Sequence, residues 1–246
     1  MVTFSSESIF HLGFLNVTNT VLDTLFVDAI ILGTSFFIVK NLSSLPSLFQ
    51  SGVELTIEWF YNLTESVAEK NVTKIFPYFM TFFIFILIAN WSGIIPGVGS
   101  IGFFEGKKLT PILRGATSDF NMTLALALIS ALATHIISVK TIGIRDYLSR
   151  YFSLNPLNFF IGVLEIISEI TKVISLSFRL FGNIFAGEIV LITVAGIFAF
   201  LFPIPFLMLE IIVGLVQALV FSMLTMVFMA ILTTPHQEHV KEVSHK

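Results

Sequence analysis

The feature that most constrains this chain is a pair of long stretches without charge. Residues 75–104 and 120–139 contain no Asp, Glu, Lys or Arg. A bilayer core about 30 Å thick is crossed by about 20 mostly apolar residues in a helix, and inside hydrocarbon only helices and closed barrels satisfy the backbone hydrogen bonds. Barrel strands alternate in hydrophobicity over about ten residues, unlike these stretches. The sequence therefore predicts an all-α membrane protein.

The composition agrees with a location in the lipid bilayer. Of the 246 residues, 55% are hydrophobic and 12% are charged, whereas about 25% of the residues in a soluble domain carry charge. The net charge is -3, and the sequence has no basic cluster of the kind that binds nucleic acid. Because cysteine does not occur, disulfides, thiolate metal sites and thiol catalysis are excluded.

A segment between the first two apolar runs has a different pattern. At 100° per residue, Glu54, Glu58, Glu65 and Glu69 fall within about 60° of one another on a helix, with apolar residues on its other sides. This pattern is typical of a helix that lies on the membrane surface. The sequence thus predicts one polytopic membrane domain over 1–246. Its segments are an outer N-terminal segment at 1–23, a first span at 24–40, a surface helix at 49–70, a helical hairpin at 75–139, a long tilted helical hairpin at 156–233 and a cytoplasmic tail at 234–246. The N-terminal segment lacks the basic region of a signal peptide.

The last hairpin contains the main ambiguity. From Pro156 to Phe202 there is no further proline, and one straight helix over this stretch would be about 70 Å long, about twice a bilayer. It is either two spans broken near Arg179 to Gly182 or one steeply tilted helix. The tilted helix is favoured because, with the N-terminus outside, it places eight cationic residues on the cytoplasmic side against three outside. The eight are Lys40, Lys70, Lys74, Lys140, Arg145, Arg150, Lys241 and Lys246, and the three are Lys107, Lys108 and Arg114. The prediction is thus about five membrane-embedded helices.

Polar residues form a stripe along this long helix. Each charged residue at the bilayer centre costs about 2.5 to 3.5 kcal/mol on insertion scales, so such residues should face protein or water. Viewed down the helix, the stripe lies within about 40° of Arg179, and it consists of Glu165, Ser168, Lys172, Ser175, Arg179 and Asn183. It resembles an aqueous path, although an inter-helix salt bridge that only fixes packing remains the alternative for Arg179.

Other charged residues lie off this stripe. Glu188 falls on the opposite face, which suggests a second aqueous entry that does not join the first. Glu210 is the single charge of the last helix; it either lines a path with Glu188 or faces the outer headgroups. Glu169 and Lys172, three residues apart, form either a local helix pair or part of the path.

The stretch from Ser175 to Glu188, SLSFRLFGNIFAGE, resembles the signature of subunit a of F-type ATP synthases, the stator beside the rotating c-ring. Three more pieces agree in order: 90–96, 117–124 and 215–221. The resemblance implies a proton-translocating subunit of the membrane sector with two offset half-channels. It also implies that Arg179 is the essential arginine, that Glu188 pairs with a group of the last helix in the outer half-channel, that Gln217 faces Arg179, and that Glu165 lies in the inner half-channel.

Two residues depart from the pattern of many bacterial members. Glu210 stands where they carry histidine, so the outer path would hold two carboxylates, and Val173 stands where they carry proline, so the long helix should not kink there. Asp119 is expected to cap the second hairpin helix together with Thr117 and Ser118, and it is also a candidate for the proton path.

The expected function is non-catalytic, because the sequence has no phosphate-binding glycine loop and no nucleophile–base arrangement. No cofactor is expected, and His236 and His239 fit a solvated tail better than a metal site. The expected partners are the c-ring, the peripheral stalk subunit b and the whole ATP synthase, in a bacterial plasma membrane or, alternatively, an organellar one. Proton and sodium coupling both stay open. The rivals are an ion-coupled secondary transporter, which usually shows internal repeats, and a structural membrane anchor.

Overall fold

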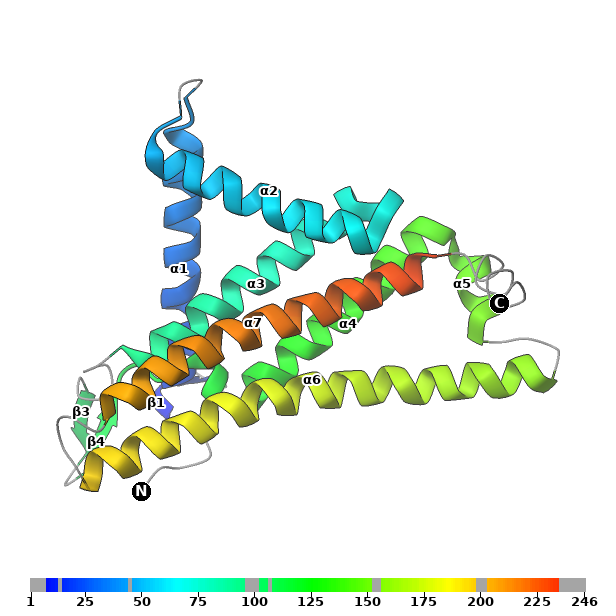
Figure 1. The fold of residues 1–246 in the computed structure, drawn as a ribbon. Helices are drawn as coiled ribbons and strands as arrows, with labels where there is room; N and C mark the ends of the chain where they lie inside the picture. Colours follow the sequence, from blue (N-terminus) through cyan, green and yellow to red (C-terminus); the bar gives the residue numbers. More distant parts are fainter. Residues whose placement is uncertain are drawn as a thin grey trace.

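The computed structural model describes residues 8–12, 15–43, 46–95, 102–105, 108–151, 156–197 and 203–234. It confirms an all-α membrane architecture with long, closely packed helices (Figure 1). The helices are α1 (Asn19–Lys40), α2 (Leu48–Ala68), α3 (Val72–Ile94), α4 (Phe120–Ile142), α5 (Ile144–Tyr151), α6 (Pro156–Ile197) and α7 (Pro203–Thr233), with short 3-10 turns η1 (Glu69–Asn71) and η3 (Ala116–Ser118).

Helix α6 is one uninterrupted helix of 42 residues, about 63 Å long at 1.5 Å per residue. It continues through Val173, Arg179 and Gly182 without a break, so the structure has the single long helix and not two spans. In Figure 1, α6 runs beside α4 and α7, and it packs against both. The last two helices therefore form the long hairpin that the sequence predicts.

Four helical segments are long and apolar enough to cross a membrane: α1, the run Leu48–Ile94, α4 and α7. Since α6 packs along two of them, α4 and α7, we describe it as the fifth membrane-embedded element. Helix α1 begins at Asn19, five residues earlier than expected, and its buried residues lie in its N-terminal part.

Helix α2 has the two faces expected of a surface helix. Phe60, Thr64 and Ala68 are buried, whereas Glu54 and Glu58 are exposed, as are Glu65 and Glu69. Its N-cap is Ser47, whose side chain accepts a hydrogen bond from the Gln50 backbone N–H. Figure 1 shows α2 running away from the end of α1 and across α3, with which it packs.

The core lies between α3 and α7. Ile75, Phe79 and Ile86 of α3 are fully buried, as are Phe221 and Met226 of α7. In lipid these contacts stabilise the fold mainly through close packing, because the tails are as apolar as the side chains. The interface also contains inter-helix hydrogen bonds, each contributing about 0.6 kcal/mol on average: the Asn90 amide donates to the Gly214 carbonyl oxygen at 2.9 Å, and Trp91 Nε1 donates to that of Ile211 at 3.2 Å.

Two short antiparallel hairpins were not predicted. Strand β1 (Ser8–Leu12) pairs with β2 (Leu15–Thr18), and β3 (Gly102–Glu105) pairs with β4 (Lys108–Pro111). Figure 1 shows β3 and β4 near the C-terminal end of α6 and α5 at the opposite end of the molecule. Near α5, Lys74 Nζ lies 3.4 Å from Thr141 Oγ1, so the start of α3 and the end of α4 meet there. Lys74 thus lies at the same end of the molecule as α5, which contains Arg145 and Arg150.

Candidate ion-translocation site

Arg179 lies near the middle of α6 with its side chain exposed. Its Nη2 is 3.4 Å from the hydroxyl of Ser175, one turn earlier, and its neighbours Ile174 and Phe178 are exposed apolar residues. Within the part of the chain that the structure describes, Arg179 forms no ion pair with a carboxylate. The side chain is therefore an exposed cation that is not paired with a carboxylate of the described residues.

A groove of about 420 Å³ leads along α6 to Arg179. Its polar lining comes from Ser168, Thr171, Lys172, Ser175 and Arg179, and its apolar lining includes residues of both α6 and α7. Four of the predicted stripe residues thus share one cavity wall. A surface of this kind can hold water or a partner's polar group in an otherwise apolar region.

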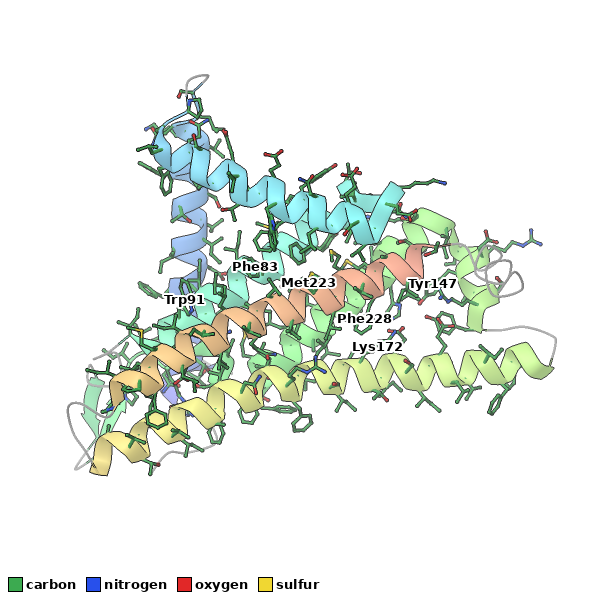
Figure 2. All side chains as sticks on the ribbon, in the orientation of Figure 1. Phe83, Trp91, Tyr147, Lys172, Met223 and Phe228 are labelled. Carbon is green, nitrogen blue, oxygen red and sulfur yellow. The ribbon has the colours of Figure 1, made fainter. Side chains whose placement is uncertain are left out.

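Lys172 lies between α6 and α7 (Figure 2). Its Nζ is 2.7 Å from Glu169 Oε1 and 4.5 Å from the centre of the Phe228 ring. Glu169 also lies 4.0 Å from His135 Nε2 of α4, and the other ring nitrogen of that histidine is 2.9 Å from the Tyr147 hydroxyl. The structure thus contains the local Glu169–Lys172 pair and extends it into a polar chain toward α5.

Glu165 is not among the residues that line the groove. Its carboxylate lies 2.6 Å from Arg150 Nε of α5, and the Arg150 side chain is 8% exposed. The approach of α5 requires Gly162, because a Cβ there would collide with the Tyr151 carbonyl oxygen. Burial raises the pKa of the Tyr151 hydroxyl, so this side chain stays neutral. In the sequence analysis Arg150 counts only as a loop charge, whereas in the structure it is the buried ion-pair partner of Glu165.

Beyond Arg179, α6 and α7 are joined by an amide pair. Asn183 Nδ2 donates to Gln217 Oε1 at 2.7 Å. Gln217 is buried, and its Nε2 has no hydrogen-bond partner among the described residues. Gln217 thus contacts α6 one turn past Arg179 and retains a free donor.

Glu188 and Glu210 lie in a second polar cluster, at the end of the molecule where α6 and α7 approach each other. Glu188 Oε2 is 3.4 Å from Arg114 Nη2, and the two side chains are 28% and 10% exposed. Glu210 is buried, and its carboxyl packs against Gly187, where a Cβ would collide with it. The Glu210 carboxyl thus lies at the contact between α7 and α6.

Asp119 is the N-cap of α4, as predicted. Its carboxylate accepts a hydrogen bond from the Asn121 backbone N–H at 2.9 Å and one from Thr20 Oγ1 at 3.3 Å. A second buried carboxylate, Asp23, accepts from Ser92 Oγ at 2.9 Å and from the Ala116 backbone N–H at 2.8 Å. These bonds tie α1 and α3 to η3.

Sequence reasoning missed Asp23 and the two paired arginines, Arg114 and Arg150. Asp23 fell at the margin of the expected first span, and the arginines counted only as loop charges. Their low exposure comes from tertiary contacts, for which the linear sequence carries no direct signal. In the described part of the chain, no group of three or more His, Asp or Glu side chains is arranged to hold a metal ion.

The chain is similar to known proteins over most of its length. The family described as ATP synthase A chain matches residues 21–230. A protein named ATP synthase subunit a from Moorella thermoacetica is 33% identical over 222 residues, covering 90% of this chain and 94% of the relative. ATP synthase subunit a 2 from Pelobacter propionicus is 34% identical over 92% of this chain and 91% of the relative, and ATP synthase subunit a from Legionella pneumophila is 32% identical with the same coverage. With this match across all its long helices, the chain belongs to the ATP synthase A chain family.

Proposed function

We propose that this chain is the non-catalytic, ion-translocating stator subunit of an F-type ATP synthase. In this role it faces a ring of c subunits, is held by the peripheral stalk subunit b and lies in a bacterial plasma membrane. The names of its relatives support membership of the complex. The observation that carries the mechanism is the exposed guanidinium of Arg179, which forms part of the polar lining of the groove along α6.

An exposed cation on a membrane-embedded helix needs a partner of opposite charge. Insertion scales assign about 2.5 to 3.5 kcal/mol to such a charge at the bilayer centre, and the described residues supply no carboxylate for it. A carboxylate on a neighbouring helix would remove that cost. The guanidinium does not lose its proton, so it favours the ionised form of each carboxyl that passes it. That carboxyl then releases its own proton toward water.

Two polar regions on either side of Arg179 support separate access routes. The groove with Ser168, Lys172 and Ser175 approaches Arg179 from the N-terminal half of α6. The cluster with Glu188 and Glu210 lies toward the other end. A fixed cation between them repels an ion that moves straight across, so ions must travel on the ring. Each charge carried through 100 mV supplies about 2.3 kcal/mol for rotation.

An ion-coupled secondary transporter is the second candidate, favoured only by the buried charges. The two candidates differ in what the isolated chain does. Reconstituted alone in vesicles under an imposed membrane potential, a transporter moves its ion unaided, whereas a stator subunit conducts little until its ring is added. Unaided ion flux at the rate of the assembled complex would overturn the proposal, as would a copurification that yields this chain without other ATP synthase subunits.

A further inference from the structure

The outer cluster contains two carboxylates and a guanidinium from three separate segments. Glu188 comes from α6, Glu210 from α7 and Arg114 from the loop before η3. The Glu210 carboxyl packs against Gly187, the residue next to Glu188 in α6. Arg114 Nη2 lies 3.4 Å from Glu188 Oε2, whereas Glu210 Oε2 is buried without a hydrogen-bond partner among the described residues. The two carboxylates therefore have different surroundings.

Arg114 is held in place by a rigid segment. Its side chain is 10% exposed, so it is not a solvated loop charge. Next to it, Gly115 lies so close to α3 that a Cβ would fall 3.1 Å from the Gly93 Cα. One residue further on, the Ala116 N–H donates to the buried Asp23 carboxylate at 2.8 Å. Helices α1 and α3 thus fix the backbone from which Arg114 reaches α6.

We propose that Arg114 is the fixed countercharge of Glu188, and that it thereby makes Glu210 the carboxyl that exchanges protons with the outer water. This inference rests on the proposed function. The pair of Arg114 and Glu188 is neutral in total, since a guanidinium keeps its proton. Without it, two like charges would share a partly desolvated space, which is unfavourable. The unpartnered oxygen of Glu210 is the position at which a proton is taken up and released.

This assignment predicts a charge-pair rescue. Removing one partner of this partly buried pair leaves a partly desolvated charge without compensation. Arg114→Gln and Glu188→Gln should therefore each lower passive proton flux through the assembled membrane sector by roughly tenfold or more, and the double variant should recover to within about threefold of the parent. Glu210→Gln should lower the flux and should not be rescued by Arg114→Gln. Arg145→Gln, at an exposed arginine of α5, is the matched control and should leave the flux unchanged.

The measurement is proton uptake into vesicles that contain the assembled complex, driven by a potassium diffusion potential. A double variant with less flux than either single variant would overturn the proposal, because Glu188 would then carry the proton itself. So would an Arg114→Gln variant as active as the Arg145→Gln control. Should Arg114→Gln fail to assemble, Arg114→Lys serves as the second variant, because lysine keeps the positive charge. This variant must keep at least about a third of the parent flux. A smaller flux in an assembled Arg114→Lys complex refutes the countercharge role.

These outcomes are separate from a failure of the proposed function. A chain that moves ions without its ring contradicts the stator role whatever the Arg114 variants do. Conversely, a ring-dependent flux that ignores Arg114 leaves the stator role intact and removes only the countercharge.

Discussion

Replacing Arg179 by alanine should abolish ATP-driven proton pumping while the subunit still assembles. The side chain is exposed and its one described polar contact is a 3.4 Å approach to Ser175, so its removal leaves no cavity and breaks no buried ion pair. The expected loss is electrostatic. Helix α6 should remain continuous, because alanine has the highest helix propensity.

The magnitude follows from the exposure of the guanidinium. For a pair near a protein surface, with an effective dielectric constant of about 20, a carboxylate about 4 Å from the guanidinium is stabilised by roughly 4 kcal/mol. At about 1.4 kcal/mol per factor of ten, the ratio of ionised to protonated carboxyl beside this position falls by roughly three orders of magnitude in the variant. Proton release from the ring would then be too rare to sustain pumping.

The assay is ATP-driven acidification of inverted vesicles, followed with a pH-sensitive dye, after equal amounts of complex have been confirmed by copurification of the ring. Arg145→Ala removes an exposed arginine from α5 and should pump normally. Lysine at position 179 should rescue poorly, since an ammonium group lacks the planar fork and can lose its proton in a desolvated place. Pumping by Arg179→Ala at the parent rate would refute the electrostatic argument.

Three other predictions concern the fold, the topology and the outer cluster. Gly162→Ala should destabilise the chain by about 1–3 kcal/mol by forcing α5 away from α6, seen as a lower thermal midpoint in detergent; Gly196→Ala, with open space at its Cβ, should not, and equal midpoints would contradict the close contact. A cysteine at Ser149 should react with an impermeant thiol reagent only from the cytoplasmic side, and one at Gly106 only from outside; the reverse pattern would invert the topology. Glu210→Gln should change the pH dependence of passive proton flux, and an unchanged profile would remove it from the outer path.

The helices could be predicted from sequence because their signals are local. The charge-free runs predict α3 and α4, the one-sided glutamates predict α2, and Asp119 marks the start of α4 as its N-cap. Position 173 holds valine and not proline, which agrees with an α6 that continues unbroken through this position. Each of these signals lies within one element, where helix periodicity and capping chemistry act directly.

The pairing of charges could not be predicted in the same way. The Arg114–Glu188 contact joins residues 74 positions apart, and the hydrogen bond from Ala116 to Asp23 spans 93. Such pairs depend on how the helices cross. The small hairpins, β1–β2 and β3–β4, also escaped notice, since strands of four or five residues carry too few positions to establish an alternating pattern.

The length of α6 has a geometric consequence for where its residues lie in the membrane. To keep both ends of a helix about 63 Å long near the surfaces of a core about 30 Å thick, the axis must lean roughly 60° from the membrane normal. Each residue then changes depth by only about 0.7 Å and shifts sideways by about 1.3 Å. The nine-residue step from Arg179 to Glu188 therefore covers roughly 6 Å of depth and 12 Å within the membrane plane. Moving a charge along α6 by one helical turn therefore shifts it within the membrane plane about twice as far as it changes its depth.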